Sequence, residues 1–210
     1  QIKVNLGYMK NKICMVGLAS GLVLGNLGFT HCCIEDIGVL RSIPNISIVV
    51  PSDPFELFKV LNEAVNYENS VYIRLTAGSN TKVINSKDYK FKIGKAEQIL
   101  PGDDVAIIGC GNILGNCLEA ASVLQDKKIQ CSVVNMHTIK PIDKEKIKDI
   151  ARKKKLIVTV EEHNIFGGLG SSVAEVLAGE RNNCKLVRVG INDFYSSGGS
   201  YEYLKNIYGL

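Results

Sequence analysis

One glycine-rich segment of the chain ends in a histidine that could take part in proton transfer. Residues 25–31 contain two glycines and end in Thr30 and His31, and a short apolar run at residues 12–16 precedes them. An imidazole can accept or donate a proton near neutral pH, and a turn after a parallel strand lies at the sheet edge where ligands bind. A lone histidine at the start of a helix is more often structural, so the residues alone leave both roles open for His31.

A second glycine-rich turn follows two carboxylates and a histidine, Glu161, Glu162 and His163. Paired carboxylates beside an imidazole suit general acid–base chemistry, whereas glycines let two backbones approach closely because they carry no side chain. We favour the second alternative and predict a dimer interface formed by Glu162, His163, Gly167 and Gly168.

Arg74 is a third candidate, since it is the one charged residue in the otherwise apolar run at residues 70–75. A buried guanidinium needs an anionic partner. Glu35 or Asp36 could supply that partner within the fold, and the phosphate of a substrate could supply it from outside. The residues alone leave these two alternatives open.

Three further motifs favour structural roles. Residues 109–115 follow a G-x-G-x-x-x-G pattern, but the next strand ends at residues 134–136 without the acidic residue of a dinucleotide site. His137 lies in an ordinary connection between a strand and a helix. The basic run at residues 152–155 suits the solvated end of a helix, where cations are favourable. We therefore expect neither a nucleotide site nor a nucleic-acid partner.

The composition is that of an ordinary globular protein, with 210 residues, 46% of them hydrophobic, and a formal net charge of +4. No apolar stretch reaches the roughly 20 residues of a membrane helix, and no signal-peptide pattern opens the chain. The seven cysteines contain no C-x-x-C pair, so we expect reduced thiols, no structural metal and a cytoplasmic location.

Alternating strand-like and helix-like segments must position these candidates. The pattern predicts strands at residues 12–16, 46–50, 70–75, 104–109, 129–135, 155–161 and 184–189. It predicts helices at residues 30–43, 112–125, 143–151, 169–177 and 201–208, and one that begins at Pro54 with Asp53 as N-cap. Such alternation indicates an α/β fold with parallel sheets.

A polar stretch divides the pattern into two parallel-sheet α/β domains. Residues 1–80 hold three strands and two full helices, too few to cover a buried parallel sheet, so we expect this domain to be incomplete. Residues 81–90 form the predicted linker, and residues 91–210 form a small complete C-terminal domain. The first nine residues look like the tail of an amphipathic helix, so we expect Gln1 to lie in the middle of a domain.

The order of these segments resembles the C-terminal section of transketolases over essentially the whole chain. The matching pieces are residues 25–31, 34–37, 44–51, 71–75, 139–143, 161–163 with the glycine-rich turn, and the ending 208–210. Several pieces also occur in beta subunits of 2-oxo acid dehydrogenases and in 1-deoxyxylulose-5-phosphate synthase. The ending favours transketolase, in the split form in which two polypeptides share the enzyme.

The resemblance implies the latter part of a pyrimidine-binding domain followed by a transketolase C-terminal domain. The complete enzyme would use thiamine diphosphate with Mg2+ or Ca2+ to transfer a two-carbon ketol unit between sugar phosphates. The glutamate that activates the aminopyrimidine would lie upstream of Gln1, so we expect this chain alone to hold no cofactor. The expected partner is an N-terminal transketolase section or subunit, in a homodimer or heterotetramer.

The family's residue roles carry over to two positions. The histidine matching His31 contacts the substrate and assists its proton transfers, and the arginine matching Arg74 binds the sugar phosphate. The loop before His31 departs from the family's Gly-Glu-Asp-Gly-Pro-Thr-His, because Asn26, Leu27 and Phe29 replace Glu, Asp and Pro. The lost Asp would bond a sugar hydroxyl.

A second family histidine corresponds to Ala19, so the natural sugars stay open. Two other functions also stay open. One is a 2-oxo acid dehydrogenase beta subunit or a deoxyxylulose-phosphate synthase-like enzyme. The other is a non-catalytic dimerisation or assembly module, in which the altered loop marks lost chemistry.

Overall fold

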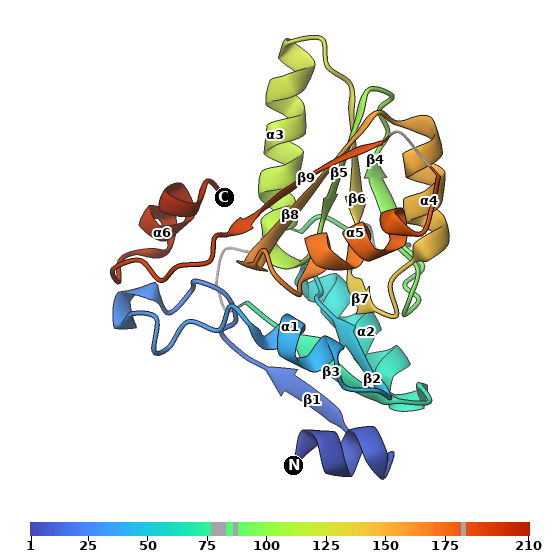
Figure 1. The fold of residues 1–210 in the computed structure, drawn as a ribbon, viewed down its shortest axis with the longest axis vertical. Coiled ribbons are helices and arrows are strands. Elements are labelled where there is room, and N and C mark those ends of the chain that lie inside the picture. The colour runs from blue at the N-terminus through green and yellow to red at the C-terminus, as the bar shows by residue number, and fades with distance from the viewer. Residues whose placement is uncertain (77–82, 86–87, 182–183) are drawn as a thin grey trace.

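The computed structural model describes residues 1–76, 83–85, 88–181 and 184–210 and contains two β-sheets, one above the other in Figure 1. The first sheet has the strand order β1 (Cys14–Gly17), β3 (Ser70–Arg74), β2 (Ile46–Val49) and β7 (Thr138–Lys140). β3 pairs in parallel with β1 and β2, and β7 is antiparallel to β2. β7 comes from the second half of the chain, so the two halves share this sheet.

The second sheet lies entirely in the second half of the chain. Its order is β4 (Glu97–Leu100), β6 (Cys131–Asn135), β5 (Val105–Gly109), β8 (Leu156–Asn164) and β9 (Lys185–Ile191). β4 is antiparallel to β6, and the other pairs are parallel. The expected α/β class is confirmed, with a parallel centre and one antiparallel edge strand in each sheet.

Six α-helices lie in the described residues. They are α1 (Asp36–Arg41), α2 (Pro54–Asn66), α3 (Leu114–Asp126), α4 (Lys144–Lys153), α5 (Leu169–Ala178) and α6 (Tyr201–Tyr208). A π-helix (Lys3–Tyr8) and two 3-10 turns (Gly25–Leu27 and Gly111–Ile113) complete the helical segments. The predicted cap of α2 is confirmed, because the Asp53 side chain accepts a hydrogen bond from the Glu56 amide at 2.8 Å.

The helix predicted at residues 30–43 is wrong in its first part, because α1 begins only at Asp36. Residues before it form turns, with Gly28 in the left-handed region at φ +83°. The Cys33 carbonyl accepts hydrogen bonds from the Gly21 amide and from Arg74 Nη2, so it serves contacts outside a helix. His31 therefore lies on a turn and does not start a helix.

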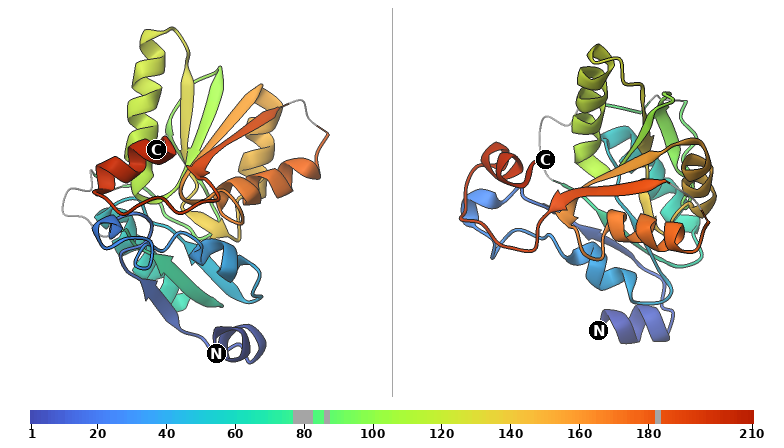
Figure 2. Two further views of the ribbon diagram at one scale, coloured as in Figure 1. Left: turned by 60° about the vertical axis from the view of Figure 1, so that its left-hand side comes forward. Right: turned by 45° about the horizontal axis from the view of Figure 1, so that its top comes forward.

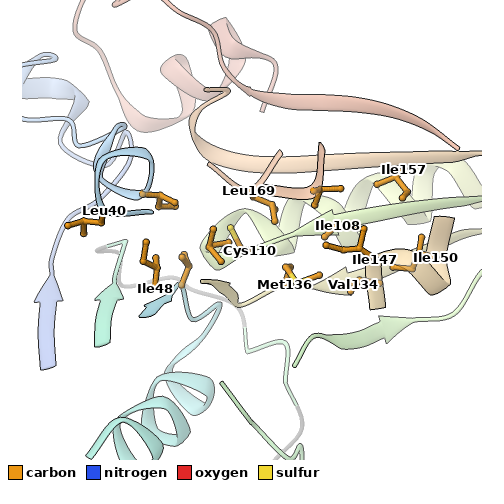
Figure 3. Packing of buried hydrophobic residues seen from close by; sticks show 14 of the residues in the cluster. Leu40, Ile48, Ile108, Cys110, Val134, Met136, Ile147, Ile150, Ile157 and Leu169 are labelled. Atoms are coloured by element: carbon orange, nitrogen blue, oxygen red, sulfur yellow. The ribbon is translucent and has the colours of Figure 1, made fainter. Parts of the chain in front are cut away.

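The hydrophobic core continues from one sheet into the other. Ile107 packs towards α3, while its neighbour Ile108 packs towards α4 and α5, as expected for adjacent residues of a strand. The cluster on the Ile108 side extends to Leu40 and Ile48 beside the first sheet (Figure 3). The first domain is thus covered on this side by the second half of the same chain.

The other side of the first sheet exposes apolar side chains. Val16 of β1 is 47% exposed, and Phe58 and Val65 on the outer side of α2 are 67% and 71% exposed. An exposed apolar surface of this kind suits a contact with another part of a protein, and the incompleteness of the first domain stays a prediction.

The predicted linker, residues 81–90, is described only at residues 83–85 and 88–90, and the rest lies outside the described residues. The amides of Ile84 and Asn85 donate to Asp53 Oδ2 at 2.8 and 2.7 Å. The described part of this segment is therefore attached to the beginning of α2.

Candidate active site

His31 lies on an exposed turn between β1 and α1. Its amide donates to the Gly28 carbonyl at 3.0 Å, and its Nδ1 lies 3.0 Å from Thr30 Oγ1. Asn26 and Leu27 are exposed on the same loop, Leu27 by 59%. This loop follows the carboxyl end of β1, as the sequence predicted, and it presents an imidazole to whatever binds there.

Arg74 has the opposite surroundings, since its side chain is only 3% exposed. Its Nε contacts both carboxylate oxygens of Asp36 at 2.9 and 3.1 Å, and its Nη2 donates to the carbonyls of Cys33 and Glu162. Burial alone would raise the pKa of Asp36, but the guanidinium and the Tyr72 hydroxyl lower it below its usual range. Within this chain Arg74 thus has the structural partner that the sequence left open, and phosphate binding stays a prediction.

The Glu162 carboxylate is buried and joins two distant segments. Oε1 accepts a hydrogen bond from the Leu22 amide, and Oε2 accepts one from the Tyr201 hydroxyl, both at 2.6 Å. Burial raises the pKa of Glu162, while its two donors and the nearby Arg74 oppose that rise. Sequence reasoning missed Leu22 and Tyr201, because no local pattern links them to residue 162.

His163 is buried between α1 and the turn after β8. Its Nε2 accepts from the Gly38 amide at 3.3 Å, so its Nδ1 carries the proton that is donated to the Asn164 carbonyl at 2.7 Å. Burial lowers the pKa of His163 to about 4, and the ring is neutral at pH 7. The adjacent Glu161 accepts hydrogen bonds from the amides of Leu169 and Gly170, and burial raises its pKa to about 7.

The glycine-rich turn brings the two halves of the chain together. A Cβ on Gly167, whose φ is +80°, would lie 2.8 Å from the Gly38 Cα, and a Cβ on Gly168 would overlap the Glu161 carboxylate. Of the predicted interface residues, Glu162, His163 and Gly167 therefore contact the first half of the same chain, while Gly168 packs against Glu161 and His163. A contact of these residues with a second chain stays a prediction.

A buried polar cluster beside α2 also escaped the sequence analysis. Glu56 is fully buried, which raises its pKa, and it accepts hydrogen bonds from Ser52, Tyr89 and Asn135. The bond from Asn135 Nδ2, at 2.8 Å, ties α2 to β6 of the second sheet. The spacing from the cap Asp53 to Glu56 is the signal that could have revealed part of this cluster.

His137, for which the sequence favoured a structural role, is enclosed by the fold. His137 is buried against the Phe91 ring, with ring centres 4.4 Å apart, and burial lowers its pKa to about 4. Its segment forms the start of β7, which the sequence missed because a three-residue strand shows no periodicity.

The buried carboxylates of Glu56, Glu161 and Glu162 all accept hydrogen bonds within the chain. That this chain alone holds no cofactor stays a prediction. In the described residues, no three His, Cys, Asp or Glu side chains gather as metal ligands. No helix there is long and apolar enough to cross a membrane.

Comparison with known families decides what kind of protein this is. The transketolase pyrimidine-binding domain matches residues 1–82, and the transketolase C-terminal domain matches residues 94–210. The chain belongs to the transketolase family. The predicted family and fold class are confirmed, while the roles of His31 and Arg74 stay predictions.

Three relatives show how much of a transketolase the chain represents. A subunit of the apulose-4-phosphate transketolase of Phocaeicola vulgatus is 37% identical over 210 residues, which cover 100% of this chain and 67% of that protein. A split gene transketolase, solved as an inactive beta4 tetramer, is 34% identical with a TM-score of 0.87, covering 100% of this chain and 65% of that one. The chain thus spans about two thirds of their length.

The third relative matches less of the chain. The 1-deoxy-D-xylulose-5-phosphate synthase of Heliobacterium modesticaldum is 38% identical over 191 residues, which cover 90% of this chain and 30% of that protein. The match to the transketolase of Phocaeicola vulgatus is therefore the more complete one.

Proposed function

We propose that this chain is the C-terminal component of a transketolase-type enzyme that transfers a two-carbon ketol unit between sugar phosphates. The observation that carries the proposal is the match to a transketolase subunit over 100% of this chain. In such an enzyme the part of the subunit that this chain does not match, together with a partner section, would hold the thiamine diphosphate and the Mg2+ or Ca2+ ion. When bound, that cofactor supplies the carbanion chemistry.

In this proposal the chain contributes the substrate side of the site. His31 stands exposed on its loop and would contact the sugar and move a proton to or from a substrate oxygen. Leu27 lies on the same loop and would face the sugar with an apolar side chain where a carboxylate stands in the family pattern. We expect a homodimer or heterotetramer in the cytoplasm, assembled with an N-terminal transketolase section.

A reconstitution experiment tests the proposal. The full polypeptide is assembled with its complementary section, and ketol transfer from several ketose phosphates is measured with and without thiamine diphosphate. We expect turnover that requires the cofactor. Absence of such turnover with every ketose donor would overturn the proposal.

Pyruvate as donor separates the other enzymes of the family. A synthase or 2-oxo acid dehydrogenase would release carbon dioxide from pyruvate and leave ketose phosphates unchanged. The match to a synthase over 90% of the chain makes this control necessary. We expect carbon dioxide release near background with this protein.

A further inference from the structure

The last segment of the chain packs against the loop that carries His31. We call residues 192–210, which follow β9, the C-terminal segment, and residues 18–35, between β1 and α1, the His31 loop. The two lie side by side in both views of Figure 2, with α6 against the loop. Leu204 of α6 is fully buried in one cluster with Leu22, Cys32 and Ile34 of the loop. The His31 loop is thus covered by the C-terminal segment, although more than 150 residues separate the two along the sequence.

A single carboxylate joins this segment, the loop and the second sheet. Glu162, at the end of β8, is 4% exposed and accepts hydrogen bonds from Leu22 of the loop and from Tyr201 of α6. Gly21 lies so close to this carboxylate that a Cβ there would overlap it. A buried carboxylate without donors is costly, so each of the two donors is held firmly in place.

Further contacts fix other points of the loop. The Gly25 carbonyl accepts a hydrogen bond from the Gly199 amide at 3.0 Å, and the Tyr195 hydroxyl donates to Glu35 Oε1 at 2.7 Å. The ring of Phe29 lies 5.3 Å from that of Tyr195. The loop is therefore held by the C-terminal segment along most of its length.

The His31 loop has little regular structure of its own to fix its shape. It contains one 3-10 turn (Gly25–Leu27) and an isolated bridge between Gly21 and Cys33. A segment without a regular helix or strand takes much of its position from the surfaces against which it packs. At its two ends Ser20 and Cys33 bond Leu75 and Arg74 at the end of β3. Between them the loop packs on Glu162 and the C-terminal segment.

We propose that the C-terminal segment sets the position of His31, with Glu162 and Tyr201 as the positioning residues that attach the His31 loop to α6. The proposal rests on the proposed function only for its effect on activity, because the attachment itself is a property of the fold. Neither residue needs to touch the substrate. The segment would thus act on the reaction only through Tyr201, Glu162 and the loop that they hold.

Two tyrosines of α6 provide a matched pair for testing this. Tyr201→Phe removes the hydrogen bond to Glu162 and keeps the ring. Tyr208→Phe also removes one hydroxyl, but among the described residues that hydroxyl bonds Ser196 and Phe194, both inside the C-terminal segment. In the assembled enzyme we expect Tyr201→Phe to lower kcat/KM for the ketose donor about tenfold, as for loss of a hydrogen bond to a charged group. Tyr208→Phe should stay within about twofold of wild type.

A double-mutant cycle with His31→Ala shows whether the effect passes through His31. If Tyr201 acts by positioning His31, Tyr201→Phe has no further effect on kcat/KM once His31 is replaced. A general loss of stability would instead lower kcat/KM by the same factor in both backgrounds. Equal factors in the two backgrounds would overturn the proposal.

Amide hydrogen exchange gives a readout that does not require activity. We expect Tyr201→Phe to speed exchange in residues 22–33 about tenfold or more, and Tyr208→Phe to leave this region unchanged. If the assembled wild-type enzyme has no turnover, the proposed function fails. The exchange rates of residues 22–33 then still test whether Tyr201 attaches the His31 loop to α6. Unchanged exchange of residues 22–33 in Tyr201→Phe would overturn the inference.

Discussion

His31 and Arg74 were both selected by the same resemblance, yet the structure gives them opposite surroundings. His31 stands exposed on a loop, while Arg74 is 3% exposed and donates to Asp36 and to two carbonyls. An exposed imidazole is available to a substrate without rearrangement. The Nε and Nη2 donors of Arg74 already bond groups within the chain and must give up those bonds before they can hold a phosphate. The resemblance therefore identifies both residues as candidates, but their different burial gives them different access to a substrate.

The largest effect that we expect is on kcat/KM, from substitution of the exposed His31. We expect His31→Ala to lower kcat/KM of the assembled enzyme by about 100- to 10,000-fold, the usual contribution of a positioned acid or base. The free energy of unfolding should change by no more than about 0.5 kcal/mol, because the side chain is exposed. Steady-state kinetics and urea titration measure the two quantities. Full activity of His31→Ala would favour a non-catalytic assembly module.

For the buried Asp36–Arg74 pair, we expect the main effect of a substitution to be on the free energy of unfolding. Asp36→Asn leaves the Arg74 charge buried without its partner, so we expect a loss of about 3–5 kcal/mol in the free energy of unfolding. Glu175→Gln is the matched control, because Glu175 pairs with Arg41 at 2.6 Å but is 65% exposed. It should cost at most about 1 kcal/mol. Similar losses for the two variants would mean that Asp36 and Arg74 are far less isolated from water than the structure shows.

Acid should destabilise the buried region through His163. Burial lowers its pKa to about 4, below the roughly 6.5 of free imidazole. The neutral ring therefore stabilises the fold fully above pH 6.5, and this contribution is lost as the pH falls towards 4. We expect about 2 kcal/mol of it to be lost by pH 5.

Urea titrations of wild type and His163→Gln between pH 5 and 7.5 measure this contribution. Glu161 acts in the opposite direction, because burial raises its pKa to about 7 and its contribution is lost as the pH rises through that value. Glu161 is present in wild type and in His163→Gln. The difference between their two profiles of unfolding free energy against pH therefore gives the contribution of His163. Parallel profiles would contradict the prediction.

Arg74→Lys tests directly whether the buried guanidinium also binds phosphate. Lysine carries the charge but cannot reproduce the contacts with Asp36 and the carbonyls of Cys33 and Glu162. From its burial we expect KM to change by the same factor, within about twofold, for phosphorylated and unphosphorylated donors. A KM increase confined to phosphorylated donors would confirm the role that the resemblance implies.

The sequence predicted those features whose signals are local. Asp53 and Pro54 marked the start of α2 because cap and first turn lie within four residues. The helix expected from residue 30 was wrong because the Cys33 carbonyl is used by Gly21 and Arg74, which no local pattern shows. β7 and the attachment of Tyr201 to Glu162 depend on contacts across the whole chain, so they required the structure.

The last prediction concerns the glycine-rich turn that closes the buried region. Gly167→Ala places a methyl group 2.8 Å from the Gly38 Cα at a φ of +80°, so we expect a loss of about 2 kcal/mol in the free energy of unfolding. Gly115→Ala is the matched control, because a Cβ there meets nothing within 4 Å and the site lies in α3. It should stabilise the protein by about 0.5–1 kcal/mol. A neutral Gly167→Ala would mean that the turn after β8 can move away from α1, and that Gly167 has room to contact a second chain.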